Sequence, residues 1–126
     1  MLVLDSGAVT RLAERSGQAA ALISALRAEG LWPPVVPSVV LIECLTGDGP
    51  RDAAQHRFLR TCDIAETVPR ALACRAAWLR ARARAGSAVD ALVTAVAEPG
   101  GTVITGDFAD LQALAEHASD VAIEPI

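Results

Sequence analysis

Short apolar segments alternate with segments of helical periodicity along the whole chain, and this alternation restricts the possible folds more than any other feature. The apolar segments are only four or five residues long and are bounded by turn residues or by helical patterns. Continuously apolar strands that are separated by helices are typical of parallel sheets covered on both faces. The sequence therefore predicts strands at 1–5, 35–38, 64–68, 102–105 and 121–124.

The intervening segments repeat apolar residues every three or four positions, as amphipathic helices do. Gly30 and Gly86 suit helix ends, and Pro50 and Pro69 suit first-turn positions. We expect helical segments at 11–30, 39–47, 51–62, 69–86, 87–101 and 107–118. The segment at 11–30 is either one helix broken at Gly17 or two helices. The prediction is an α/β fold with one domain over 1–126 and a five-stranded, mostly parallel sheet.

Composition limits the functional classes. The formal net charge is -4 and every basic residue is an arginine, so the chain as a whole lacks the usual basic character of a nucleic-acid-binding protein. The three cysteines have no CxxC spacing and no nearby histidines, and we expect them to be small buried residues rather than zinc ligands. The sequence shows no secretory signal and no apolar run of about 20 residues, so we expect a cytoplasmic protein.

Five acidic residues lie where a solvated surface position explains them poorly. Asp5 closes the first predicted strand, and Glu43 lies within the apolar segment VVLIECL. Asp90 has apolar neighbours in SAVDALVTAVA, and Asp107 and Asp110 follow the fourth strand in VITGDFADL. In open parallel sheets, functional groups gather beyond the carboxyl ends of the strands, near the point where strand order reverses. Three of these sites, at 5, 43 and 107, come just after a strand, and we therefore expect them at one edge of the sheet.

Each acid taken alone also has an ordinary structural explanation. Asp5 could cap a helix that starts near Val9, and Asp107 could cap the helix that follows it. Asp90 could be a first-turn acid favoured by the helix dipole, and Glu43 could extend into solvent. Independent caps have no reason to converge on one edge, so the two explanations predict different arrangements of the same residues.

Convergence of carboxylates requires a cation. Two carboxylates about 5 Å apart repel each other by roughly 3 kcal/mol at an effective dielectric constant near 20. An all-oxygen, carboxylate-rich site suits a hard divalent ion, Mg²⁺ or Mn²⁺. Such an ion can activate water and stabilise the charge on a phosphodiester during hydrolysis. With the five acids set aside, the remaining acidic residues nearly balance the arginines, which is compatible with an anionic substrate.

The predicted helix at 69–86 is rich in arginine. Its apolar stripe consists of Leu72, Ala76, Leu79 and Ala83. Arginines lie on both sides of this stripe, with Arg75 and Arg82 on one flank and Arg80 and Arg84 on the other. These arginines suit either the solvated flanks of an ordinary amphipathic helix or a surface that binds phosphate groups.

The order of the acids resembles the four acidic motifs of PIN-domain ribonucleases. The motifs are VLDSGAV, VPSVVLIECLTG, SAVDALVTAVA and TVITGDFADL, and they run from residue 3 to residue 111. The chain looks most like the short single-domain toxins of VapBC-type toxin–antitoxin pairs. The resemblance implies a three-layer α/β/α sandwich, a bound Mg²⁺ that Mn²⁺ can replace, and endonucleolytic cleavage of RNA. It also implies a homodimer and inhibition by a VapB-like antitoxin.

Carried over residue by residue, the resemblance implies that Asp5, Glu43, Asp90 and Asp107 are the catalytic residues. Asp5 and Asp90 would be the principal metal ligands, and Asp107 and Glu43 would complete the cluster directly or through water. Asp110 is similar to a second acid often found in the fourth motif. The expected reaction is attack of a metal-activated water on the phosphodiester, which leaves a 5′-phosphate and a 3′-hydroxyl.

Smaller features of the motifs also bear on the resemblance. Ser6 and Thr105 match hydroxyl residues that the family often has beside its first and fourth acids. Gly7 and Gly106 depart from the family, which often has polar residues at these positions, and therefore remove possible hydrogen bonds to the metal ligands.

Other functional classes fit the sequence less well. A flavodoxin-like phosphoacceptor domain or a haloacid-dehalogenase-type phosphatase would need a lysine, and the chain has none. No GxxxxGK motif is present. We expect His56 and His117 to be surface residues, which argues against a histidine-based ribonuclease. A catalytically weak or inactive PIN-like module that binds RNA or protein stays as an alternative.

Overall fold

The computed structural model describes all 126 residues. Its five strands are β1 (Leu2–Leu4), β2 (Val35–Pro37), β3 (Asp63–Ala65), β4 (Thr102–Thr105) and β5 (Ala122–Pro125). They form one sheet in the order β3-β2-β1-β4-β5, and every neighbouring pair is parallel. The predicted α/β class and five-stranded sheet are confirmed, and the sheet is entirely rather than mostly parallel.

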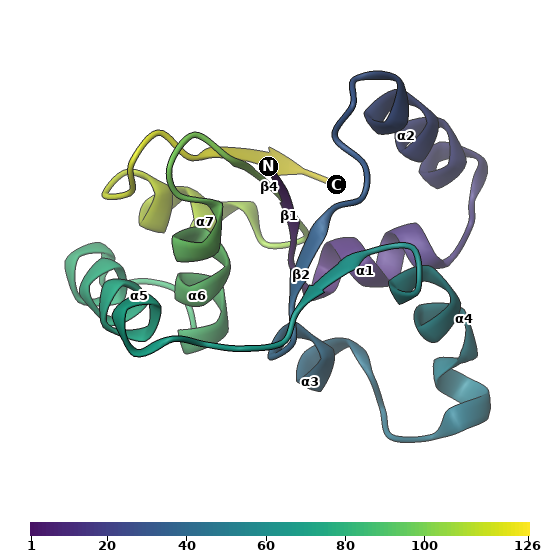
Figure 1. Cartoon of the computed structure of the whole chain (residues 1–126), viewed down its shortest axis with the longest axis horizontal. Helices are drawn as coiled ribbons and strands as arrows, with labels where there is room; N and C mark the ends of the chain where they lie inside the picture. The colour runs from purple at the N-terminus through teal and green to yellow at the C-terminus, as the bar shows by residue number, and fades with distance from the viewer.

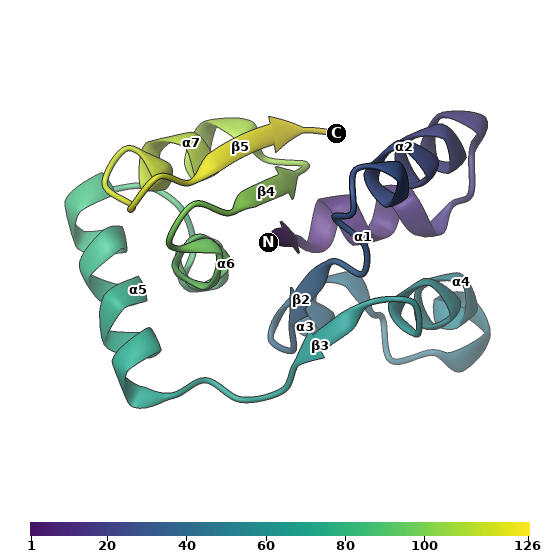
Figure 2. The ribbon, with the colours of Figure 1, turned by 45° about the horizontal axis from the view of Figure 1, so that its top comes forward.

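Seven helices cover the two faces of this sheet (Figure 1). On one side lie α1 (Ser6–Ala13), α2 (Gly17–Ala28), α3 (Val40–Cys44) and α4 (Gly49–Leu59). On the other side lie α5 (Arg70–Ala83), α6 (Ala88–Ala97) and α7 (Phe108–Ala115) (Figure 2). The molecule is therefore a three-layer α/β/α sandwich, and strand order reverses between the central strands β1 and β4.

The apolar strands place the core in the middle of the molecule. Val3, Val36 and Val103 on the three central strands are fully buried, which agrees with strands that are covered on both faces. A second, smaller apolar cluster packs α5 against α6 and α7. It consists of Ala76, Leu79, Ala91, Leu92, Ala95 and Leu114. The predicted apolar stripe of the arginine-rich helix is part of this contact.

Most element boundaries shift from the sequence prediction, and two of the shifts have a clear physical cause. The first helix begins at Ser6 rather than near Val9 or Arg11, because the Asp5 carboxylate accepts a hydrogen bond from the Ala8 N–H at 2.7 Å. The third strand ends at Ala65 rather than at residue 68. It lies at the edge of the sheet and pairs only with β2, which itself ends at Pro37.

The cysteine prediction is wrong for one of the three residues. Cys44 is buried and Cys62 is half-buried, but Cys74 is exposed on the outer face of α5. Burial raises the pKa of the Cys62 thiol to about 11, so this thiol is protonated near neutral pH.

One buried acid has a purely structural role that the sequence pattern did not indicate. The Asp52 carboxylate accepts hydrogen bonds from the Thr46 N–H at 2.9 Å and the Gly47 N–H at 2.9 Å. The Thr46 hydroxyl donates to it as well, at 2.8 Å. These donors lower the pKa of Asp52 and fix the turn between α3 and α4.

None of the seven helices combines the length and the apolar character that crossing a lipid bilayer requires.

Candidate active site

The best-anchored acid of the candidate site is Asp5, which follows β1 at the carboxyl edge of the sheet. Its side chain is only 5% exposed. One carboxylate oxygen accepts a hydrogen bond from the Ala8 N–H of α1, and the other accepts one from the Thr105 hydroxyl at the end of β4. The Gly106 N–H also points at this carboxylate, at 3.2 Å and 3.3 Å from its two oxygens. Asp5 therefore both caps α1 and connects the two central strands.

Thr105 also positions the fourth motif. Its hydroxyl oxygen accepts a hydrogen bond from the Asp107 N–H at 2.8 Å, and the same hydroxyl donates a hydrogen bond to the Asp5 carboxylate. Asp107 occupies the N-cap position of α7, yet its carboxylate makes no capping hydrogen bond. The capping explanation of Asp107 is therefore wrong, and its exposed carboxylate is free to bind a ligand.

Asp90 is held in a capping box at the start of α6. The Ser87 N–H donates to the Asp90 carboxylate at 2.8 Å, and the Asp90 N–H donates to the Ser87 hydroxyl at 3.1 Å. The first-turn explanation of Asp90 is thus correct. It does not exclude a second role, because each hydrogen bond uses only part of the acceptor capacity of a carboxylate.

Glu43 reaches the same region from α3. Partial burial raises the pKa of its carboxyl group, and the negative charges of Asp90 and then Asp5 raise it further. Two acids that are 47 and 38 positions away in the sequence therefore act on Glu43 through space. The charge repulsion predicted from convergence is present in the folded chain.

A polar cleft of about 660 Å³ collects these residues, and none of the residues that line it is hydrophobic. Its lining residues are Asp5, Ser6, Gly7, Thr10, Arg11, Glu14, Glu43, Ser87, Asp90, Gly106, Asp107 and Asp110. All five acids singled out from the sequence are among them. Sequence reasoning missed Thr10, Arg11 and Glu14, although their spacing from Gly7 places them on one face of α1.

The carboxylates line the cleft but do not form a compact cluster. As they stand, no three His, Cys, Asp or Glu side chains are placed closely enough to hold a metal ion together. The donor set itself consists of carboxylate and hydroxyl oxygens, which suits Mg²⁺ or Mn²⁺. Glu43 and Asp107 are exposed and their carboxylates accept no hydrogen bond, so both can change conformation at little cost.

Gly7 and Gly106, both lining the cleft, pack directly against each other. A Cβ atom on Gly7 would lie 2.9 Å from the Cα of Gly106, and one on Gly106 would lie 3.1 Å from the Cα of Gly7. Side chains are disfavoured here because α1 and the turn after β4 approach backbone to backbone. This approach is what places the Gly106 N–H against Asp5.

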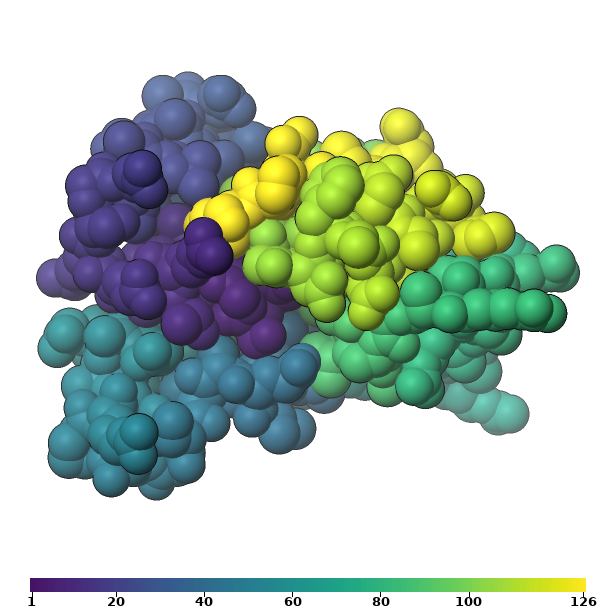
Figure 3. Space-filling view, turned by 180° about the vertical axis from the view of Figure 1, so that it is seen from behind, coloured from purple at the N-terminus to yellow at the C-terminus, as the bar shows by residue number.

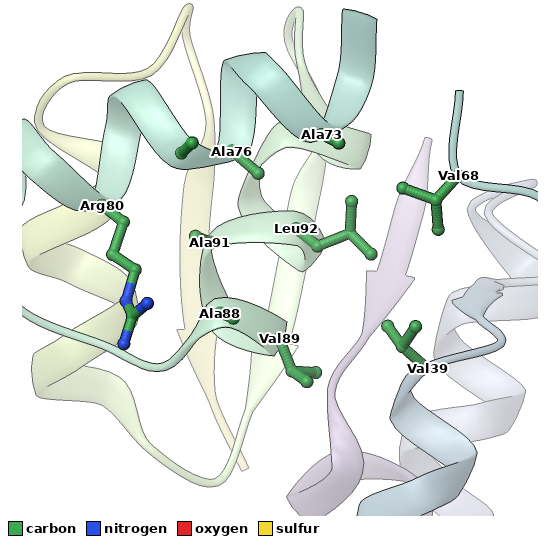
Figure 4. Close-up of a pocket in the computed structure, with 10 residues that line it drawn as sticks. Val39, Val68, Ala73, Ala76, Arg80, Ala88, Val89, Ala91 and Leu92 are labelled. Carbon is green, nitrogen blue, oxygen red and sulfur yellow. The ribbon is translucent and has the colours of Figure 1, made fainter. Parts of the chain in front are cut away.

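Other residues with possible chemistry lie elsewhere. His56 and His117 are exposed and do not line the cleft, as expected. A separate apolar groove of about 310 Å³ lies between α5 and α6, and Arg80 is its one polar lining residue. Figure 4 shows Arg80 at one end of this groove and Val68 and Val39 at the other.

Of the comparisons with known proteins, the one with solved structures supports the fold. The chain is similar to the crystal structure of FitAcB from Neisseria gonorrhoeae, with a TM-score of 0.64 and 20% sequence identity. The similarity covers 98% of this chain and 96% of that one, so nearly every element has a counterpart. No protein-family model matches the sequence, and no curated protein matches it. The comparison therefore shows a shared fold over the full length.

The contact between the glycines leads to a first prediction. Gly7→Ala forces the backbone at Gly106 away and weakens the Gly106–Asp5 hydrogen bond, so we expect a loss of about 1–3 kcal/mol in the free energy of unfolding. Gly17→Ala is the matched control, because a Cβ there has no atom within 4 Å. Urea denaturation measures both variants. Equal stability of the two would contradict the close approach.

The raised pKa of Glu43 leads to a second prediction. A carboxyl group with a raised folded-state pKa stabilises the fold at acidic pH, and this stabilisation is lost as pH rises through that pKa. Glu43→Gln should therefore raise the Tm at pH 7, and the gain should shrink as the pH falls toward the ordinary glutamate range. Glu66→Gln, an exposed glutamate outside the cleft, is the control. A Tm difference that does not change with pH would mean that Glu43 does not experience the other acids.

Proposed function

We propose that this chain is a Mg²⁺- or Mn²⁺-dependent endoribonuclease and acts as the toxin of a toxin–antitoxin pair. The observation that carries the proposal is the meeting of Asp5, Glu43, Asp90 and Asp107, from four distant motifs, around one cleft without hydrophobic lining. The order of these motifs resembles PIN-domain ribonucleases, and the three-layer fold agrees with that resemblance.

The residues of the cleft fit a divalent ion by chemistry. Asp5 and Asp90 are fixed by hydrogen bonds from Thr105 and Ser87, and would provide the rigid ligands. Asp107 and Glu43 would turn toward them when the ion binds, since neither carboxylate is held by a hydrogen bond. When bound, the ion supplies activation of water and neutralises charge on the phosphodiester.

The chain itself supplies position and charge. The hydrogen bonds to Asp5 hold its carboxylate at the carboxyl edge of the sheet, so this ligand needs no reorganisation during the reaction. Arg11 is the one basic residue that lines the cleft, and its guanidinium is suited to a phosphate oxygen. No histidine is placed to act on the 2′-hydroxyl of RNA.

The proposal extends to partners. A cognate VapB-like antitoxin would block the acidic cleft, where basic side chains find complementary charge. The apolar groove between α5 and α6 offers an adjacent uncovered surface. The homodimer and the cytoplasmic location are part of the same proposal and rest on the resemblance and on the sequence.

Cleavage of RNA by the purified chain, free of any antitoxin, is the third prediction. We expect cleavage only with Mg²⁺ or Mn²⁺, and Asp107→Asn should lower kcat/KM by more than about 100-fold because it removes a ligand charge. Its Tm should not fall, since the Asp107 carboxylate makes no capping hydrogen bond. Asp63→Asn, an exposed acid on β3 outside the cleft, should cleave normally.

Three results would overturn parts of this proposal. Cleavage that persists in excess chelator would contradict the dependence of the reaction on a metal ion. Full activity of Asp107→Asn would contradict the assignment of Asp107 as a metal ligand. A folded protein that cleaves no RNA with either ion would instead be the inactive binding module.

A further inference from the structure

The surface of α5 carries a concentration of positive charge that is unusual for this acidic chain. Five of the eleven arginines lie between residues 70 and 84, and no acid occurs from Thr67 to Val89. The only ion pair in the structure joins Arg75 to Glu98 at 2.7 Å. The other four arginines of this segment, Arg70, Arg80, Arg82 and Arg84, have no acidic partner. A local excess of unpaired positive charge attracts a polyanion.

Nothing in the molecule covers this surface. In Figures 1 and 2, α5 is the outermost helix on its side of the sheet, beyond α6. In the space-filling view from behind, the teal-green segment at its position forms one end of the molecule (Figure 3). The residues between the two arginine flanks include Ala77 and Ala81, which are small and exposed. A strand of nucleic acid can therefore approach the helix closely.

An exposed tryptophan lies among these arginines. Trp78 is 43% exposed, with the Arg75 guanidinium 4.6 Å and the Arg82 guanidinium 5.1 Å from its ring centroid. Arg75 is fixed by two hydrogen bonds to Glu98, at 2.9 Å and 2.7 Å. Arg82 has no other partner and can move. Unpaired bases stack on exposed aromatic rings and on guanidinium planes, so Trp78 and Arg82 together form a stacking platform.

The opposite flank of α5, which carries Arg80 and Arg84, lies on the side of the helix near the acidic cleft. The Arg80 Nε donates to the Gly86 carbonyl at 3.3 Å, which leaves its terminal nitrogens without a hydrogen-bond partner. Gly86 directly precedes Ser87, which lines the cleft beside Asp90. Arg80 therefore presents free N–H donors at the end of the helix nearest the candidate active site.

We propose that α5 is a binding surface for single-stranded RNA, on which a base stacks against Trp78 and Arg82 while Arg80 and Arg84 bind the phosphates that lead to the cleft. The identity of the ligand as RNA rests on the proposed function, whereas the surface itself rests on the charge and on the exposed Trp78. This surface would favour unpaired segments of the substrate, because a base within a duplex cannot reach the ring.

Binding of a fluorescently labelled 12-nucleotide oligouridylate, measured by anisotropy in EDTA, tests the proposal without cleavage. The double variant Arg80→Gln/Arg84→Gln should bind more weakly and reduce the slope of log K against log[salt] by about 0.7 per lost phosphate contact. Trp78→Ala should weaken binding at least about fivefold, and Trp78→Phe should restore most of it. Arg57→Gln/Arg60→Gln on and beside α4 is the matched control and should bind like the parent protein.

Tryptophan fluorescence gives a second readout. Trp32 and Trp78 are the only tryptophans, so Trp32→Phe leaves Trp78 as the single reporter. Single-stranded RNA should quench its emission, and the same sequence in a duplex should quench it far less. Equal binding by the α5 variants and the α4 control, or tighter binding of duplex than of single strand, overturns the proposal.

The outcomes separate this inference from the proposed function. A protein that cleaves RNA but whose α5 variants bind it normally contradicts only the α5 surface. A protein that binds single-stranded RNA through α5 and never cleaves it contradicts only the nuclease. An α5 surface that binds an acidic peptide and no RNA contradicts the inference and identifies a protein partner instead.

Discussion

The hydrogen bonds of one buried carboxylate, Asp5, connect the elements on which the candidate site depends. Its three kinds of donor come from α1, from the end of β4 and from the turn after β4. The backbone of that turn approaches α1 so closely that a side chain on Gly7 would force the two backbones apart and one on Gly106 would be tightly packed. The relative position of the first and fourth motifs is therefore set by the same contacts that hold the centre of the sheet together.

Structural and functional roles coincide in the acids of the cleft. Asp5 caps α1, Asp90 belongs to the capping box of α6, and both also line the cleft, so a structural role for these two acids is compatible with a place in the candidate site. Asp107 and Glu43 are different, because neither carboxylate accepts a hydrogen bond that would explain, on structural grounds, why an acid stands at that position. The cleft thus combines two fixed carboxylates with two adjustable ones, an arrangement in which an ion can be bound without loss of the fold.

The strand pattern predicted the sheet closely because every central strand is short, apolar and buried on both faces. The third strand was predicted too long, since a sequence pattern does not show that its only neighbour ends at Pro37. Convergence of Asp5, Glu43 and Asp107 followed from their positions after parallel strands, but the orientations of their side chains did not. The turn fixed by Asp52 and the contact between Gly7 and Gly106 depend on distances in the folded chain, and no local pattern in the sequence predicts them.

The central claim is that the four acids converge in order to bind one divalent ion. Crystals of the protein grown with saturating Mn²⁺ and measured at the manganese absorption edge test it most directly. The account predicts an anomalous peak in the cleft, bound by Asp5 and Asp90, with Asp107 or Glu43 turned toward it. An anomalous map with no peak in the cleft at saturating Mn²⁺, or with manganese bound only elsewhere on the molecule, would contradict the account.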